Sequence, residues 1–128
     1  MEHNLYDSIS ASLTVNPGAK TADVTGTGVD LAGYETAVCH LQSGTKTDGT
    51  HTPKLQESSD NSTFTDVAAA DLEGSFTAVA SNAVQVVGYK GSSRYIRLFV
   101  TVAGATTGAV YGASIVKGRA RHNPAGVA

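Results

Sequence analysis

Four histidines carry the side chains best suited to proton transfer or metal binding in this chain of 128 residues. They are His3, His40, His51 and His122, and none lies at a metal-ligand spacing from a cysteine or another histidine. One arrangement stays open. If the segments around His40 and His51 pair as a hairpin, the two rings face each other, and Asp48 in the loop completes a small metal site. Strand histidines are more often simply packed or solvated, and we favour that interpretation.

An oxygen-rich segment, DNSTFTD from Asp60 to Asp66, carries side chains of the kind that bind calcium. It lacks the order of a calcium loop and a late bidentate glutamate, so we expect a turn whose side chains bind their own backbone amides. The single cysteine, Cys39, lies in the alternating run YETAVCHL and is expected to be a small buried apolar residue. Because no nucleophile stands beside a positioned base, we predict no enzymatic activity, no metal and no cofactor.

The composition predicts that these residues sit on β-strands. Threonine, valine, serine and alanine crowd the chain, which also has 14 glycines, and such residues suit short strands with frequent turns. About seven or eight short strands at regular spacing predict an all-β fold, a single antiparallel β-sandwich. One helical turn is expected within AAADLEGSF, residues 68–76, and Asn16-Pro17-Gly18 reads as a turn.

Two hairpins are predicted in the first half. Residues 34–43 alternate, and one face of the run holds Tyr34, Thr36, Val38, His40 and Gln42, while the other holds Glu35, Ala37, Cys39 and Leu41. This run is expected to pair with residues 52–58 through a long loop. A second hairpin is expected to join residues 54–58 to residues 64–67 around the polar turn SSDNST.

The strongest strand pattern is SRYIRLFVTV, residues 93–102. Its alternation places Ile96, Leu98, Val100 and Val102 on the core face and Tyr95, Arg97, Phe99 and Thr101 on the other. A hairpin loop over AGATTGA is expected to lead into a final strand over VYGASIVKG, residues 110–118. With Tyr111 on a neighbouring strand, Tyr95 and Phe99 would form an exposed aromatic stripe suited to a subunit contact.

Both ends of the chain differ from the middle. We expect an N-terminal arm over residues 1–11, the β-sandwich over residues 12–118, and a basic, flexible tail over residues 119–128. The end of the chain carries Lys117, Arg119, Arg121 and His122. It is either a frayed, solvated terminus or a basic peg that orders against an acidic partner surface.

Charge is divided along the chain although the net charge is only −2. Residues 1–73 hold three lysines and all eleven acidic residues, whereas residues 74–128 hold six basic residues and no acidic one. Either acidic and basic strands neutralise each other across one sheet, which we favour, or the charge orients the subunit against a partner. This balance, without a basic helix, predicts no nucleic-acid binding. The sequence pattern also predicts neither a secretion signal nor a membrane span, hence a protein made in the cytoplasm.

Three stretches resemble a family of small structural proteins of tailed bacteriophages, the capsid decoration or cement proteins. They are TADVTGTGVDLAGYETAVCHL, DGTHTPKLQESSDNSTFTDVAAADLEGSF and VVGYKGSSRYIRLFVTVAGATTGAVYGASIVKGRARHNP, and together they span nearly the whole chain. The resemblance implies a jelly-roll β-sandwich that assembles as a trimer on the outside of the head. It also implies the major capsid protein as partner and the virion as location, after synthesis in the host bacterium.

The resemblance supplies no reactive motif, so partner contacts are predicted from side-chain type alone. The residues predicted to bind a partner are Tyr6, Tyr95, Arg97, Phe99, Tyr111, Lys117, Arg119, Arg121 and His122. The main alternative is a carbohydrate-binding module used for adhesion to a host surface, because residues 54–67 and 94–102 are also similar to strands of discoidin-like sandwiches. A sugar platform favours exposed aromatic rings, and the chain has no tryptophan. Another head, neck or fibre protein is a further alternative.

Overall fold

The computed structural model describes the backbone of residues 9–120 and the side chains of residues 9–118. The strands are β1 (Ser10–Lys20), β2 (Val24–Thr25), β3 (Val29–Asp30), β4 (Tyr34–Lys46), β5 (Thr50–Ser58), β6 (Thr65–Asp66), β7 (Leu72–Glu73), β8 (Val84–Tyr89), β9 (Tyr95–Ala103) and β10 (Ala109–Ala120). One short 3-10 helix, η2 (Ala69–Asp71), supplies the predicted helical turn. The predicted all-β class is confirmed.

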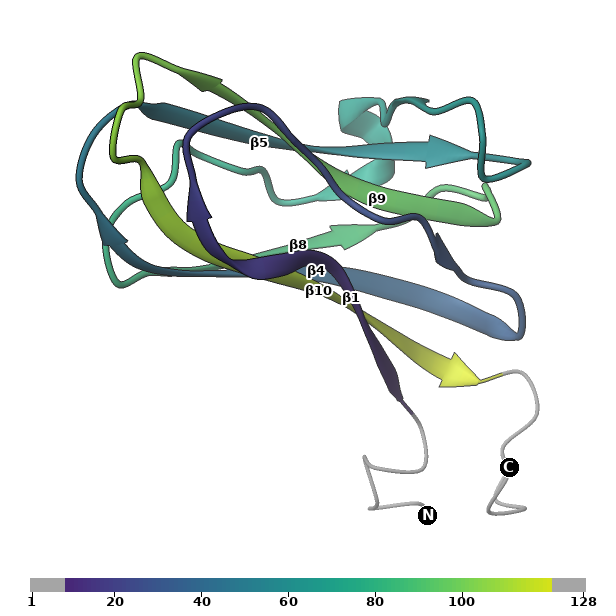
Figure 1. Cartoon of the computed structure of the whole chain (residues 1–128). Helices are drawn as coiled ribbons and strands as arrows, with labels where there is room; N and C mark the ends of the chain where they lie inside the picture. The colour runs from purple at the N-terminus through teal and green to yellow at the C-terminus, as the bar shows by residue number, and fades with distance from the viewer. Residues whose placement is uncertain (1–8, 121–128) are drawn as a thin grey trace.

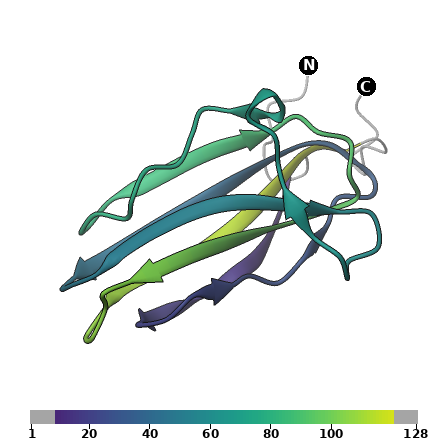
Figure 2. The same cartoon turned by 90° about the horizontal axis from the view of Figure 1, so that it is seen from above.

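The strands form two antiparallel sheets that pack face to face (Figure 1). One sheet has the order β1-β10-β4-β8-β7, and the other has the order β2-β9-β5-β6 with β3 also paired to β9. Seen from above, the strands of the two layers run in similar directions, as in an aligned sandwich (Figure 2). Both layers therefore have one face toward the core and one face toward solvent.

The strand order is that of a jelly roll. Both β2 and β3 pair with β9, so they occupy one strand position. The two-residue strand β7 only extends the first sheet beside β8. Without β7, the strands occupy eight positions, with the order 1-8-3-6 in one sheet and 2-7-4-5 in the other. This interleaving is the double Greek key of jelly rolls. The predicted jelly-roll sandwich is confirmed.

The core lies between the sheets, and alternation along the strands fills it. Ile96, Leu98 and Val100 of β9 are fully buried, as predicted, and they face Ala37, Cys39 and Leu41 across the interior. Burying Cys39 raises the pKa of its thiol to about 12, so this cysteine is an unreactive apolar residue, as predicted.

Two of the predicted hairpins are wrong. The chain passes from β4 in one sheet to β5 in the other, and from β9 to β10 in the same way, so neither pair is hydrogen-bonded. Alternation is identical whether the next strand joins the same sheet or the opposite one, so the pattern could not distinguish the two. The hypothetical site between His40 and His51 fails with the first hairpin, since the two residues belong to different sheets.

The hairpin between β5 and β6 is confirmed, with Gln56 opposite Asp66. Its turn is held as predicted by its own side chains: Ser58 Oγ accepts from the amides of Asp60 and Asn61, and Asp60 Oδ1 accepts from those of Ser62 and Thr63. The turn is thus a closed local structure rather than a calcium loop.

The edge strand β1 departs from the prediction around Asn16-Pro17-Gly18. The predicted turn is part of the strand, which continues to Lys20 with two register irregularities, between Leu13 and Val15 and between Val15 and Gly18. In this distorted part, the Thr14 hydroxyl accepts from the Leu98 amide of the other sheet. Ser10 and Ala11 of the predicted arm belong to β1, Ile9 directly precedes the strand, and residues 1–8 lie outside the described residues.

Candidate interaction surface

The outward side of the β1-β10-β4-β8 sheet presents side chains in three registered rows. The pairing places Leu13, Ser114, His40 and Val86 side by side in one row. A second row holds Gly112, Gln42 and Val84, with Pro17 against Gly112, and a third holds Ala11, Val116, Val38 and Gly88. We call these residues, with Ile9 and Val110, the apolar face. None of them is a lysine, arginine, aspartate or glutamate, and Glu73 on β7 marks its margin beside Gly88.

This face holds every large hydrophobic residue that is exposed in the described part of the chain. The exposed fractions are 36% for Ile9, 52% for Leu13, 58% for Val84, 54% for Val86 and 43% for Val110. Single exposed apolar residues are common on soluble proteins, but five on one side of one sheet are typical of an interaction site.

A groove of about 300 Å³ runs along the apolar face over β1, β10 and β4. Its walls include Leu13, Pro17, His40 and Gln42, and Gly112 lies among them. A Cβ at Gly112 would lie 3.0 Å from the Pro17 backbone, so glycine is what allows the distorted part of β1 to approach β10. On the other side of β4, Val84 and Val86 are more than half exposed, and we call this pair the ridge. The face therefore has a ridge and a groove at the same level along the strands.

The outward side of the other sheet is built differently. Its residues Lys54, Phe64, Tyr95, Arg97 and Phe99, with Arg94, form what we call the aromatic–cationic face. Each ring has a cation over it: Arg97 lies 3.9 Å from the Phe64 centroid, Arg94 lies 5.2 Å from Tyr95, and Lys54 lies 5.4 Å from Phe99. Such pairs are attractive through the ring quadrupole. Polar bonds continue the network, since Arg97 donates to Gln56, which with Lys54 donates to Asp66.

The structure separates the residues predicted to bind a partner. Tyr95, Arg97 and Phe99 lie together on the aromatic–cationic face, at half-exposed positions. The prediction that Tyr111 lies beside them is wrong, because β10 belongs to the other sheet and the Tyr111 side chain points into the core, 1% exposed. The Arg119 side chain, like Tyr6, Arg121 and His122, lies outside the described part.

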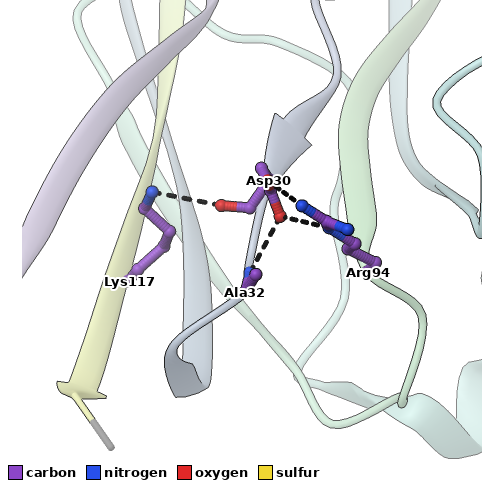
Figure 3. A network of polar contacts seen from close by, with 4 residues as sticks. All are labelled: Asp30, Ala32, Arg94 and Lys117. Atoms are coloured by element: carbon purple, nitrogen blue, oxygen red, sulfur yellow. Dashed lines mark hydrogen bonds and ion pairs between the residues drawn. The ribbon is translucent and has the colours of Figure 1, made fainter. Parts of the chain in front are cut away.

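Lys117 is held at the end of the sandwich where β1 begins and β10 ends (Figure 3). Its Nζ donates to the backbone oxygen of Asp30, 3.1 Å away, and lies over the Tyr34 ring. The Asp30 carboxylate accepts two hydrogen bonds from the Arg94 guanidinium, at 2.9 and 2.8 Å, and one from the Ala32 amide. The Arg94 hydrogen bonds, and secondarily the amide, lower the pKa of Asp30 to about 2.

A polar cleft of about 260 Å³ opens at this same end and is lined by Tyr34, Glu35, Ser93 and Arg94 among others. Arg94 is already paired with Asp30, and the Tyr34 ring is already covered by Lys117. The ion pair joins an acidic residue of the first half to a basic residue of the second, as expected if the charged halves neutralise each other.

His51 and Asp48 are bonded within the fold. His51 is fully buried between the sheets, with Nδ1 3.1 Å from the Tyr111 hydroxyl and Nε2 3.1 Å from the Asp48 carbonyl oxygen. Because a carbonyl only accepts, Nε2 donates to it, and in the tautomer with its proton on Nε2 the ring accepts at Nδ1 from the Tyr111 hydroxyl. The Asp48 carboxylate accepts from the amides of residues 106–108, chiefly Gly108, and these bonds lower its pKa.

Within residues 9–118, no three histidine, cysteine, aspartate or glutamate side chains gather as a metal site would require. Over the same part of the chain, no helix has the length and apolar character needed to cross a membrane.

Sequence reasoning missed the apolar face, although a signal was present. In β8, Val84 and Val86 alternate with Gln85 and Val87, and in β10 Val110 and Val116 have the opposite parity to the buried Ile115. Apolar residues at both parities are typical of strands that are covered on both sides. The single-chain structure covers only one side.

Comparison with known proteins supports the fold. No family model and no curated protein sequence matches the chain. Among solved structures, the chain is similar to the crystal structure of the SPBc2 prophage-derived protein YomS, with a TM-score of 0.54. The match covers 85% of this chain and 92% of that one, at 14% sequence identity. The likeness is therefore one of fold, shared with a protein of prophage origin.

Proposed function

We propose that the protein is a bacteriophage virion protein that decorates the capsid by binding the lattice of major capsid protein. It acts as a homo-oligomer, a trimer if the resemblance to decoration proteins holds. The observation that carries the proposal is a jelly-roll body whose fold is shared with a prophage-derived protein and whose outer side exposes five large hydrophobic side chains on one sheet. Two further features add support. Polar side chains such as Asp48 form hydrogen bonds within the chain. The start of β1 and the end of β10 also lie together at one end of the body, where Ser10 pairs with Lys117.

Decoration needs no chemistry. A protein that binds the assembled lattice and not its free subunits stabilises the assembly by mass action, in proportion to how far its concentration exceeds its dissociation constant. Joining several copies raises the effective concentration of each remaining contact, so weak individual contacts give stable attachment. A rigid sandwich suits this role because little conformational entropy is lost when it binds.

The aromatic–cationic face argues against the carbohydrate alternative. Sugar platforms offer open ring faces, whereas Phe64, Tyr95 and Phe99 are each covered by an arginine or lysine of the same chain. Binding to a glycan array at micromolar concentration would nevertheless replace the present proposal with that one.

The direct test is sedimentation with emptied heads of the phage that encodes the protein. We expect saturable co-sedimentation and a higher melting temperature of the decorated heads. The tail is tested by deleting residues 121–128, because a deletion starting at Lys117 would remove the end of β10 and its pairing with β1. Weaker attachment of the truncated protein with an unchanged fold supports the basic peg. Failure of the full chain to sediment with heads would contradict the proposal.

A further inference from the structure

We propose that the apolar face is the contact between two copies of this chain, which pack ridge into groove about a two-fold axis parallel to the strands. The inference goes beyond the proposed function: it adds a two-fold contact to the three-fold contacts of the proposed trimer, concerns the isolated protein and does not require a capsid. It rests on the registered rows of the face, on its lack of charge and on its shape.

The rows decide which residues meet. A two-fold axis parallel to the strands, between β10 and β4, exchanges β1 with β8 and β10 with β4, and keeps each residue at its own level. In the first row, Val86 of one copy then lies over Leu13 of the other, and His40 lies over Ser114. Each contact occurs twice, as in any isologous interface.

The second row brings the shapes together. Val84 of one copy lies over Pro17 of the other, and the long side chain of Gln42 lies over Gly112. The ridge of Val84 and Val86 thus enters the groove, and the groove of the first copy receives the ridge of the second. Because ridge and groove lie at the same level, one axis satisfies both contacts.

The chemistry of the face favours a second copy over a charged partner. A face without charged residues meets its own copy without placing like charges together, whereas it offers nothing to pair with charges on another surface. His40, Gln42 and Ser114 supply the few polar groups, near the axis, where each copy offers the other both donors and acceptors. The charged residue Glu73 lies at the margin, where solvent remains accessible.

The size of the face indicates the strength of the contact. Four strands at the usual spacing and about eight residues of rise give a flat footprint of about 500 Å². This is smaller than the area of about 800 Å² per partner in stable complexes. We therefore expect a weak, transient complex with a dissociation constant on the order of micromolar. Measurements must extend to at least about 200 µM to detect it.

Sedimentation equilibrium of the full chain from 1 to 200 µM is the first test. We expect a concentration-dependent dimer, and at least a tenfold weaker association for Val86→Asp. Thr101→Asp is the matched control, because Thr101 is an exposed strand residue on the outward side of the other sheet. Circular dichroism and a urea unfolding curve at 1 µM verify that both variants are folded.

Cross-linking tests the axis itself. Leu13→Cys and Val86→Cys variants are mixed and treated with a short bismaleimide; the buried native Cys39 is protected by its position. We expect a cross-linked pair in the mixture and much less product with either variant alone. Leu13→Cys with Thr101→Cys is the negative control.

The outcomes separate this inference from the proposed function. A monomer at 200 µM, or an oligomer that Val86→Asp leaves unchanged, overturns the inference and leaves capsid binding to be judged by co-sedimentation. A trimer whose formation does not respond to Val86→Asp also overturns it. A hexamer that Val86→Asp reduces to trimers supports both, since two-fold contacts would then join three-fold assemblies.

Discussion

The two outward faces of this sandwich handle their apolar surface in opposite ways. On the aromatic–cationic face, the rings of Phe64, Tyr95 and Phe99 lie under cations of the same chain, and the cations are bonded further to Gln56 and Asp66. On the apolar face, five large hydrophobic side chains have no such cover within the described residues. One face has its rings covered within the single chain, and the other leaves its large hydrophobic side chains open to solvent. Whether a surface residue can form an intermolecular contact therefore depends on what covers its side chain rather than on its type.

The largest expected effect is a difference in the free energy of unfolding between substitutions on the apolar face and substitutions in the core beneath it. Val86 points outward and is 54% exposed, whereas its neighbour Val87 is 1% exposed. Val87→Thr places a hydroxyl in the core and should lower the free energy of unfolding by about 1–3 kcal/mol. Val86→Thr should change it by less than about 0.5 kcal/mol when urea unfolding is measured at 1 µM, where copies stay apart. Equal losses for the two variants would show that Val86 is not open to solvent.

A smaller effect should appear on the aromatic–cationic face. The Arg97 guanidinium lies 3.9 Å from the Phe64 centroid, and a double-mutant cycle of Arg97→Met and Phe64→Leu should give a coupling free energy of about 0.5–1 kcal/mol. The Lys54–Phe99 pair, at 5.4 Å, is the comparison and should couple more weakly. A coupling near zero for both would mean that this face is open to partners after all.

The smallest effect concerns the ion pair at the end of the body. The pKa of Asp30 is lowered to about 2, first by the hydrogen bonds from Arg94, so its ionised form is favoured in the folded state. Its stabilisation is complete above the ordinary pKa of 3.8 and is lost as the pH falls toward 2. Unfolding curves between pH 2 and pH 6 should show a weaker acid dependence for Asp30→Asn than for the wild type. Parallel curves would contradict the assignment; Asp71→Asn serves as the control carboxylate.

Alternation and turn chemistry predicted much of the local structure, whereas the predictions that failed concern which strands pair with each other. The faces of residues 34–42 and 95–102, the buried Cys39 and the self-bonded turn after Ser58 were all predictable from alternation and turn chemistry. The partners of each strand were not, because a jelly roll sends consecutive strands to opposite sheets. Tyr111 was misplaced for this reason. The apolar face was not predicted because Val84 and Val86 alternate with the buried Val87, and apolar residues at both parities are equally typical of a strand covered on both sides.

The distorted edge strand β1 has a consequence for how far association can proceed. A regular edge strand of eleven residues would offer unpaired amides and carbonyls to a strand of another molecule, and repeated strand addition could extend the sheet into a fibre. The two irregularities, Pro17 and the tether from Thr14 to Leu98 interrupt that template. Growth by backbone pairing is thereby discouraged, and particles built from this protein should stop at a finite size instead of forming fibres.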